Sequence, residues 1–526
     1  MRHSQRKSRR RSVAFCAGWL LACSLCAGCQ PAPEETSGPR RIILLSMDTV
    51  RADHVSGYEG ATTTPVLAEI AEEGVRLQDF YAASSFTLPS HMSIFTGLDP
   101  AEHGVFREEA ELDRRIPTLA ETLGKAGYAT AAFHEGGYVS PRYGFGRGFD
   151  RSLEFSRLEL VSGSLSRVTD WIRAHRGDRY FLFVHTYAAH FPYGGWQRHR
   201  SRGVGAERFE PRRLEALRQR FDSAHAERRE GRAPERIGDA LRADCTLFNQ
   251  LAEHHGELLG CGDNFLSAEY LDPVHGSEDL AAVRESYDER IRRIDAALAR
   301  IRETLRDLGE WDDTLLVVTA DHGEAFLEHG QSQHDYIPFD EVLKVPAVWS
   351  WPRGFGETGG REVEGATWHL DLMPTILGLS GVAYPGRARG LDLSQVLKGE
   401  RELAAERTVH PAVLRLAHRE PRAERRVAVR GNWKYIEGDA LFGDSEGLLF
   451  DRSRDRQERV NLRQEEPEVF QSLEAESLRW RRGLEASSAR HRHSGAPLPG
   501  DPLAPVPAVS LTPQERQQLR ELGYVD

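Results

Sequence analysis

Residues 41–48 of this 526-residue chain read Arg-Ile-Ile-Leu-Leu-Ser-Met-Asp, and residues 314–322 read Thr-Leu-Leu-Val-Val-Thr-Ala-Asp-His. Each stretch is a short apolar run that ends at acidic or imidazole side chains. Residues 180–184 form a third run of this kind, which ends at His185. Short apolar runs without alternation are typical of strands that are buried in a parallel sheet.

Amphipathic helices are expected between these strands. Residues 64–71 have Thr64 as the expected N-cap and Pro65 at the first helical position, and Gly74 follows as a stop signal. In residues 287–308, apolar side chains recur at alternating steps of four and three, which places them on one face of a helix. Because strands and helices alternate, we predict an α/β fold with a mainly parallel sheet flanked by helices.

The composition is that of a globular protein with a mildly acidic charge balance. Hydrophobic residues make up 40% of the chain and charged residues 28%, and 69 Lys and Arg stand against 80 Asp and Glu, a formal net charge of −11. Nucleic-acid-binding proteins carry a basic stripe or patch. We therefore expect no nucleic-acid partner.

The first 29 residues predict an exported protein. Six basic residues and no acidic residue fall within residues 1–11, and residues 13–28 are apolar and uncharged. This combination is typical of an export signal and is short for a membrane span. The sequence before Cys29 resembles a bacterial lipoprotein cleavage site, with Cys29 as the lipidated residue. Cleavage before Cys23, an uncleaved anchor and an ordinary secretory signal are the alternatives.

We therefore expect a periplasmic or cell-envelope lipoprotein that is attached to the membrane through Cys29, with residues 30–40 as a linker. Removing residues 1–28 leaves 63 Lys and Arg against 80 Asp and Glu, a charge of −17. Such a body disfavours polyanionic substrates, except where Arg-rich loops reverse the field locally. Cys245 and Cys261 lie in the exported part, where disulfides persist, and both a disulfide and two separate thiols stay open.

The composition changes along the exported body and suggests its domains. We assign residues 41–390 to a large domain, with an insertion rich in Arg, Glu, Ala and His at about 194–280. Residues 391–480 follow as a small C-terminal α+β domain, and residues 481–526 as a linker and terminal helix. Short elements are expected as strands at 426–429, 434–436 and 448–450, and as a helix at 513–522.

Polar side chains follow three of the predicted strands: Asp48, then His185 with His190, then Asp321 with His322. In open α/β sheets the ligand crevice forms outside the carboxyl ends of the strands, so these side chains are expected to meet. Two Asp and one His are a partial shell for a divalent cation, and the imidazole favours manganese or zinc over calcium. Each Asp alone is equally well explained as a turn former or helix cap, so their joint placement carries the argument.

Residues 87–91 read Thr-Leu-Pro-Ser-His and predict the start of a helix, with Pro89 in its first turn and Thr87 at about the N-cap. Backbone N–H groups and the helix dipole at such a start favour an anion. A hydroxyl there is well placed to attack a phosphoryl or sulfuryl centre when a metal lowers its pKa. A threonine that only caps the helix is the simpler alternative.

These motifs resemble those of the sulfatase family within the alkaline-phosphatase superfamily, over most of residues 41–465. The matching stretches occur in the family's order: the opening strand and first metal aspartate at 43–53, the nucleophile helix at 87–97, the substrate-binding His-x-Pro at 190–193, the second metal motif at 319–324, and His329 with His334. The resemblance implies an alkaline-phosphatase/sulfatase-like α/β fold with a small C-terminal α+β domain.

Four departures from the family pattern bear on the chemistry. Thr87 stands where sulfatases carry the Cys or Ser that becomes formylglycine, and a threonine, whose Cβ bears a methyl group, cannot be oxidised to that aldehyde. His91 replaces the family's Arg, Thr49 replaces the second Asp of an Asp-Asp pair, and residues 134–137 replace a Lys-x-His motif. Thr-x-Pro-x-His occurs in relatives that resemble nucleotide pyrophosphatases and phosphodiesterases.

The resemblance and its departures imply a metal-dependent ester hydrolase with Thr87 as its nucleophile. One or two divalent ions are expected, with manganese or zinc favoured and calcium or magnesium as alternatives. The implied metal ligands are Asp48, Thr87, Asp321 and His322. His190 and His334 would stabilise the non-bridging oxygens or protonate the leaving group, and His91 would orient Thr87.

The expected substrates are phosphate mono- or diesters, or phosphonate esters, of a small molecule, a glycan or a lipid. The alternatives are a sulfuric ester hydrolase without formylglycine, a phospho-headgroup transferase and a non-catalytic binding lipoprotein. Transferases of this kind carry several membrane spans, for which the sequence offers no further apolar run of adequate length. A non-catalytic protein would bind no divalent ion.

Overall fold

The computed structural model describes residues 38–191, 277–493 and Thr512, apart from gaps at 107–109, 157–158, 327, 330–331, 335, 357–358, 385, 387, 415–423 and 439–444. Met1–Gly38 forms one unit and Pro39–Asp526 another, and every element named below belongs to the second unit. Outside the described residues lie the predicted export signal with Cys29, nearly all of the linker and of the insertion, Cys245, Cys261 and the predicted terminal helix.

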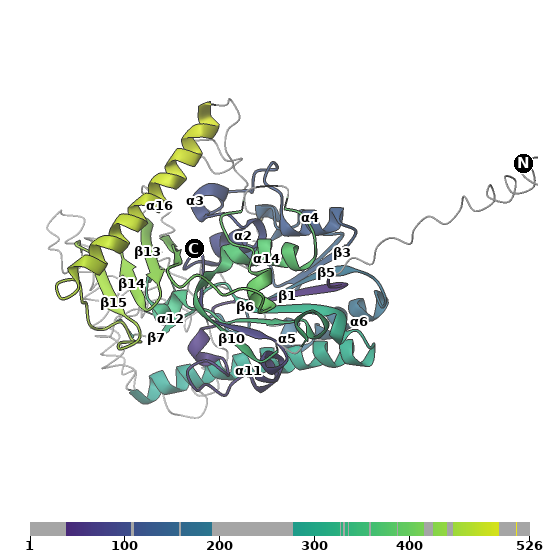
Figure 1. Cartoon of the computed structure of the whole chain (residues 1–526). Coiled ribbons are helices and arrows are strands. Elements are labelled where there is room, and N and C mark those ends of the chain that lie inside the picture. The colour runs from purple at the N-terminus through teal and green to yellow at the C-terminus, as the bar shows by residue number, and fades with distance from the viewer. Residues whose placement is uncertain are drawn as a thin grey trace, which may run out of the picture. The chain divides into compact units, whose positions relative to one another are not determined.

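An eight-stranded sheet forms the centre of the second unit (Figure 1). The strand order is β10-β2-β9-β6-β1-β5-β3-β4, and all neighbours pair in parallel except β9, which is antiparallel to both β2 and β6. The strands are β1 Arg41–Met47, β2 Val75–Tyr81, β3 Ala129–His134, β4 Arg151–Glu154, β5 Tyr180–Thr186, β6 Thr314–Ala320, β9 Ala347–Ser350 and β10 Arg361–Trp368.

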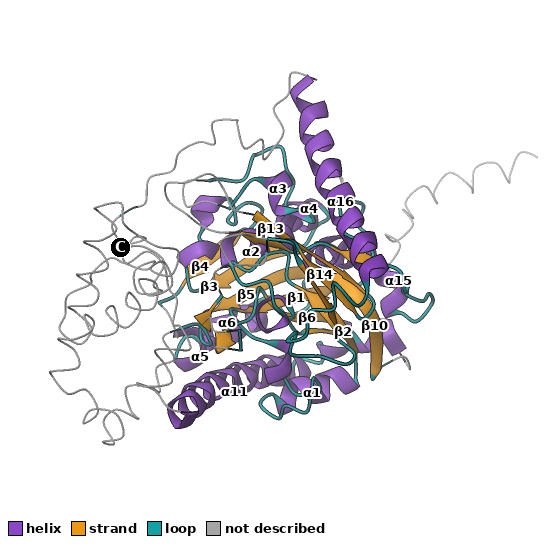
Figure 2. Ribbon diagram, turned by 90° about the vertical axis from the view of Figure 1, so that its left-hand side faces the viewer, coloured by secondary structure: helices purple, strands orange, loops and turns teal. Residues whose placement is uncertain are grey.

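Helices cover both faces of this sheet, as Figure 2 shows. One face carries α1 Pro65–Glu72, α5 Glu159–Ser162, α6 Leu165–Ala174 and α11 Ser277–Asp307. The other carries α2 Thr87–Thr96, α4 Leu119–Lys125 and α14 Leu372–Leu379. With both faces covered, β1, β5 and β6 are buried along their whole lengths, which explains their unbroken apolar runs.

The remaining elements are short, apart from one long C-terminal helix. They are η1 Ala52–His54, α3 Pro100–His103, η2 Gly137–Val139, η3 Pro141–Tyr143, η4 Trp311–Asp313, the hairpin β7 Ala325–Phe326 with β8 Ser332–Gln333, α12 Asp340–Leu343, α13 Pro352–Phe355, η6 His369–Asp371, α15 Ser394–Leu397 and α16 Pro467–His493. Within the described residues, no helix is long and apolar enough to cross a membrane.

The predicted α/β fold is confirmed, with one correction at the first helix. Thr64 occupies the N-cap of α1, but its hydroxyl caps no helical N–H. The hydroxyl instead accepts a hydrogen bond from the Ser56 amide at 2.9 Å, so it holds the preceding loop. The stripe predicted at 287–308 lies on α11, which begins ten residues earlier, and buries Tyr287 and Ile291 against the sheet's main core.

A second, antiparallel sheet follows in the order β11-β13-β14-β15, with β12 paired to β13. It contains the three strands predicted for the small domain and consists of β11 Thr408–Val409, β12 Ala412–Leu414, β13 Glu424–Arg430, β14 Trp433–Ile436 and β15 Leu448–Asp451. Its inner face packs Val427 and Ile436 with Tyr81 and Trp368 of the large sheet. The two sheets therefore share a core, and α16 covers part of the small one.

The core of the large sheet continues beyond the predicted domain boundary at residue 390. Leu393, Val396 and Leu397 are buried in that core, where α15 packs on α14. Residues just after position 390 therefore contribute to the core of the large sheet, and the domain boundary at 390 stays a prediction.

Candidate active site

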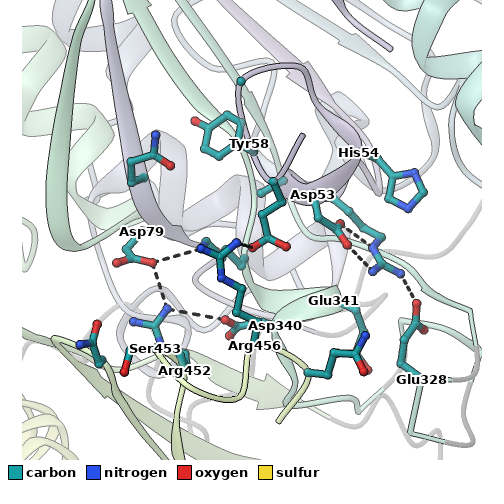
Figure 3. Close-up of a pocket in the computed structure, with 18 of the residues that line it drawn as sticks. Asp53, His54, Tyr58, Asp79, Glu328, Asp340, Glu341, Arg452, Ser453 and Arg456 are labelled. Carbon is teal, nitrogen blue, oxygen red and sulfur yellow. Dashed lines mark hydrogen bonds and ion pairs between the residues drawn. The ribbon is translucent and has the colours of Figure 1, made fainter. Parts of the chain in front are cut away.

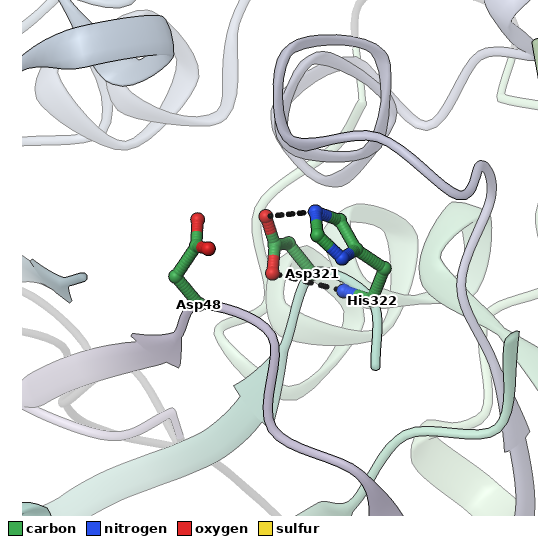
Figure 4. Close-up of side chains that lie close together, drawn as sticks. All are labelled: Asp48, Asp321 and His322. Carbon is green, nitrogen blue, oxygen red and sulfur yellow. Dashed lines mark hydrogen bonds and ion pairs between the residues drawn. The ribbon is translucent and has the colours of Figure 1, made fainter. Parts of the chain in front are cut away.

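Three buried side chains meet where β1 and β6 end. These strands pair in parallel with Met47 opposite Ala320, so the next residues, Asp48 and Asp321, emerge side by side. His322 follows directly. One ligand atom from each of Asp48, Asp321 and His322 lies within 4.8 Å of the others, and all three side chains are completely buried. Figure 4 shows the two carboxylates facing the same space, with the His322 ring beyond Asp321.

The two carboxylates form an electrostatically unfavourable pair. Burial, followed by the charge of Asp321, raises the pKa of Asp48 well above its usual range. Burial works in the same direction on Asp321, but the neighbouring histidines, His322 first, lower the pKa of that carboxyl. Asp48 Oδ1 and Asp321 Oδ2 are buried, and no donor among the described residues forms a hydrogen bond with either oxygen. Two such oxygens beside an imidazole fit a divalent cation, which would neutralise both charges.

Thr87 is the first residue of α2, and Phe86 is the N-cap. The predicted N-cap position of Thr87 is therefore wrong by one residue. The physical reason is that the Thr87 hydroxyl turns away from the helix: Oγ1 donates to Asp48 Oδ2 at 3.4 Å and lies 3.1 Å from His322 Nε2. The structure thus brings Thr87 to the Asp48, Asp321 and His322 group, as the sequence predicts.

His91 lies one turn into α2, beneath Thr87, and is completely buried. Its Nδ1 lies 3.0 Å from the Thr87 carbonyl oxygen and 3.5 Å from Asp321 Oδ2, and its Nε2 lies 2.8 Å from Ser46 Oγ. Burial lowers the pKa of His91 and thereby favours the neutral form of the ring. His91 therefore contacts both the backbone of Thr87 and one carboxylate of the candidate metal site.

His190 and His334 meet on the other side of Thr87. Their Nε2 atoms lie 3.4 Å apart, and the rings of His334 and His322 have centroids 4.2 Å apart. His190 Nδ1 lies 2.6 Å from the Phe191 carbonyl oxygen and His334 Nδ1 lies 3.2 Å from that of Ser85. Burial, and then His322, lower the pKa of His334 well below its usual value. All the predicted site residues therefore lie in one cluster.

Sequence reasoning left the contribution of three further residues unassigned. His185 Nε2 lies 3.4 Å from Asp48 Oδ2, so His185 meets Asp48 as its strand-end position predicts, although the sequence assigned it no role in the site. Ser46 supports His91. Thr49, with φ of 58°, donates its backbone N–H to Asp321 Oδ1 at 3.1 Å. A strand-end position was the only available signal for His185 and Ser46, and a backbone donor such as Thr49 N carries no sequence signal.

Glu135 lies in the stretch that replaces the family's Lys-x-His motif. Its Oε2 accepts hydrogen bonds from the Tyr187 amide at 2.7 Å and from Thr186 Oγ1 at 3.1 Å. The carboxylate therefore ties the end of β3 to the turn that leads to His190. Where the family has its Lys-x-His motif, this chain therefore has a buried carboxylate that holds the turn before His190.

The large mixed sheet and the hydroxyl beside an Asp, Asp and His group define an α/β ester-hydrolase class. Two solved structures have this fold. A structure in complex with its substrate D-glucosamine-2-N,6-O-disulfate is 18% identical with a TM-score of 0.61, and covers 85% of this chain and 98% of its own. The phosphonate monoester hydrolase of Agrobacterium radiobacter is 20% identical with a TM-score of 0.60, and covers 86% and 96%.

Sequence comparison narrows the class to one family. The model of the family described as Sulfatase matches residues 40–382. N-acetylglucosamine-6-O-sulfatase of Bacteroides thetaiotaomicron is 24% identical over 429 residues, which are 74% of this chain and 76% of that protein. The chain belongs to the sulfatase family, within the alkaline-phosphatase superfamily. It is accordingly a hydrolase that acts on ester bonds.

Proposed function

We propose that the chain is a divalent-metal-dependent hydrolase of phosphate mono- or diesters or of phosphonate esters, with Thr87 as its nucleophile. The position of the Thr87 hydroxyl carries the proposal: it is completely buried, 3.4 Å from Asp48 Oδ2 and 3.1 Å from His322 Nε2. The Cβ methyl group excludes conversion to an aldehyde. The hydroxyl oxygen itself is therefore the reactive atom of this side chain.

Four residues would hold the ion: Asp48, Thr87, Asp321 and His322. When bound, a divalent ion lowers the pKa of a coordinated hydroxyl and withdraws charge from the ester. The donor set combines carboxylate oxygens with one imidazole nitrogen, which favours manganese or zinc. Thr49 stands where the family has a second aspartate, so the site lacks one hard oxygen ligand. The backbone N–H of Thr49 instead donates a hydrogen bond to Asp321 Oδ1.

The proposed reaction consists of two displacements at phosphorus, with the Thr87 oxygen as the nucleophile of the first and the leaving group of the second. Thr87 Oγ1 gives its proton to Asp48 Oδ2, its hydrogen-bond acceptor, and attacks the phosphorus. The Oγ1–P bond forms as the bond from phosphorus to the leaving oxygen breaks. Water then attacks the phosphothreonine and gives its proton to the His190 and His334 pair, while the Oγ1–P bond breaks and Asp48 returns its proton to Oγ1. The start of α2, where the helix dipole is positive, favours the anionic phosphoryl group.

The pair of His190 and His334 supplies the general acid. Each Nδ1 faces a backbone carbonyl oxygen, an acceptor, so each Nδ1 carries a proton. The two Nε2 atoms lie 3.4 Å apart, so a proton taken up at this place would be shared by both rings. Because burial lowers the pKa of His334, this proton is readily given to the leaving alkoxide. Well-placed acids of this kind contribute about 10²–10⁴-fold in rate.

The exported location is part of the same proposal. Residues 1–28 would direct export, and lipidation of Cys29 would hold the body at the membrane of the cell envelope. A small ester of a glycan or lipid is then within reach of the site. Two assays test this part. We expect globomycin to block processing of the chain, and we expect palmitate to label the wild type but not Cys29→Ser.

Sulfate esters are the second candidate substrate class, and the sulfatase relative favours them. The test compares kcat/KM for an aryl phosphate, an aryl phosphodiester, an aryl phosphonate and an aryl sulfate, each with Mn²⁺ or Zn²⁺. We expect the phosphorus esters to be cleaved fastest, and Thr87→Ala to abolish that activity. Sulfate as the fastest substrate, together with retained activity in Thr87→Ala, would overturn the proposal.

A further inference from the structure

A buried ion-pair cluster joins the small sheet to the loop that carries His334. Lys434 on β14 is completely buried, and its Nζ lies 2.6 Å from Asp340 Oδ1 and 2.7 Å from Glu458 Oε1. We name Lys434, Asp340 and Glu458 the Lys434 cluster. Well-packed apolar residues often replace a buried ion pair without loss of stability, so stability alone does not account for the cluster.

Through Asp340 the cluster borders a polar cleft of about 900 Å³, lined by residues of the large sheet and by small-domain residues that lie just before β14 and just after β15. Figure 3 shows Arg452 in this cleft between two carboxylates. Its Nη1 lies 2.9 Å from Asp79 Oδ1 and 3.7 Å from Asp340 Oδ2. Arg452 thus places a second positive charge near Asp340, while its shorter ion pair is with Asp79.

Glu458 holds the His334 loop at two points. Its Oε2 accepts the backbone N–H of Asp340 at 2.7 Å, at the start of α12. Its backbone oxygen lies 3.3 Å from His329 Nε2, near the start of the loop. His329 Nδ1 in turn lies 2.6 Å from Glu341 Oε1. His329 and Asp340, which precede and follow His334 in the chain, are therefore both held by Glu458 of the small domain.

From α12 the connection continues to the candidate metal ligands. The Val342 carbonyl oxygen accepts the Gly323 N–H at 2.7 Å, and the Glu341 carbonyl oxygen accepts the Glu324 N–H at 3.0 Å. A Cβ at Gly323 would lie 2.1 Å from the Glu341 oxygen, so only glycine permits this approach. Gly323 directly follows His322. The backbone of α12 therefore holds the turn that presents His322.

We propose that the Lys434 cluster of the small domain positions the His322 turn and the His334 loop, so that Lys434 and Glu458 are positioning residues for the site. Removing the Lys434 amine leaves two buried carboxylates side by side, which repel each other and displace α12. Because α12 contacts the His322 turn through its backbone, the displacement reaches the metal ligands. Catalytic groups lose function when they move by about 1 Å.

The test measures metal binding and local protection in Lys434→Met of the whole chain. We expect Mn²⁺ affinity, measured by calorimetry, to fall about 10–100-fold, as for other residues that support metal ligands. Hydrogen exchange at the Gly323 and Glu324 amides should accelerate, while amides of β5 keep their protection. Glu458→Gln, which keeps the side chain's shape, should produce the same changes to a smaller degree and serves if Lys434→Met fails to fold.

Arg426→Met is the matched control. Arg426 of β13 makes an equally buried ion pair with Asp99, at 2.7 Å, between the small domain and the loop before α3. We expect this variant to lose stability and yet to bind Mn²⁺ as the wild type does. Wild-type affinity and exchange in both Lys434→Met and Glu458→Gln would overturn the inference, and so would equal loss of affinity in Arg426→Met.

The inference rests on the proposed function only for its catalytic consequence. If Lys434→Met accelerates exchange at Gly323 and weakens Mn²⁺ binding while the wild type hydrolyses no ester, the positioning role stands and the proposed function fails. If the wild type turns over esters and Lys434→Met lowers kcat at unchanged KM and Mn²⁺ affinity, with unaltered exchange, the proposed function stands and the positioning role fails.

Discussion

The hydroxyl oxygen of Thr87 lies 3.1 Å from Nε2 of His322, although 235 residues separate them in the chain. The contact joins the start of α2 to the end of β6, and Asp48 at the end of β1 completes it. The proposed nucleophile on one element and the proposed metal ligands on two others are held by buried strands and a helix. The chemistry therefore depends on contacts that can be removed one at a time.

Thr87→Ala should lower kcat/KM for the preferred ester by roughly 10³-fold or more, because it removes the attacking oxygen. Thr96→Ala in the same helix is the matched control. Thr96 is also buried, but its hydroxyl donates to the Met92 carbonyl oxygen at 2.7 Å and faces no site residue. Steady-state kinetics of the two purified variants make the comparison; comparable losses in both would refute a specific role of the Thr87 hydroxyl.

His91→Ala should lower kcat more than it changes KM, because the ring orients Thr87 and touches no substrate. A loss of about 10–100-fold is expected, with a stability loss of roughly 2–4 kcal/mol from the cavity and the lost hydrogen bonds. Ser46→Ala removes the partner at Nε2 and should cost about 1 kcal/mol. In a double-mutant cycle by urea unfolding, additive effects would show that the two side chains are not coupled.

We expect the buried Asp48 carboxyl to destabilise the metal-free protein at high pH. Its pKa is raised in the folded state, so its contribution to stability is present below its ordinary pKa and is lost as the pH rises through the raised value. We expect Asp48→Asn to be more stable than the wild type without metal at pH 8. With Mn²⁺ at 100 times its Kd the wild type should gain about 2.7 kcal/mol, and Asp48→Asn much less. Thermal unfolding of both proteins with a chelator and with Mn²⁺ tests whether the metal makes the wild type the more stable of the two. If Asp48→Asn stays more stable with Mn²⁺ present, Asp48 is not a metal ligand.

Acid should destabilise the fold through its buried histidines. Burial lowers the pKa of His134 to about 4, and of His369 and His410 to about 3. A group whose pKa is depressed in the folded state contributes stability above its unfolded pKa, near 6.5, and loses it as the pH falls. Each contributes a loss of about 1.4 kcal/mol per pH unit below 6.5. Urea unfolding between pH 7.5 and 5 measures the slope, which His410→Gln should reduce; a slope unaltered by that variant contradicts this assignment.

The sequence was sufficient to predict which strand-end side chains meet in the site, but it did not predict the residues that hold those side chains in position. Asp48 and Asp321 could be placed together because parallel strands end at the same edge of a sheet. Ser46 lies two residues before Asp48 on the same strand. Its sequence position gives no signal of its contact with His91, since a buried Ser resembles any other core residue. Lys434 and Asp340 lie 94 residues apart, and nothing in their spacing predicts a pair.

The N-terminus of α2 shows the same limit on a smaller scale. Pro89 correctly predicts a helix start, but proline is tolerated throughout the first turn, so the pattern locates the N-cap only to within a residue. The tertiary contacts of Thr87 decided the boundary, because its hydroxyl satisfies Asp48 in place of a helical N–H.

The central claim is that the phosphoryl group passes through the Thr87 oxygen. The direct measurement is rapid acid quench during turnover of an aryl phosphate, followed by proteolysis and mass spectrometry of the peptide that contains Thr87. We predict a phosphoryl group on Thr87 that appears faster than steady-state turnover and is absent from Thr87→Ala. Full turnover with an unmodified Thr87 peptide at every quench time, and undiminished kcat in Thr87→Ala, would contradict the account.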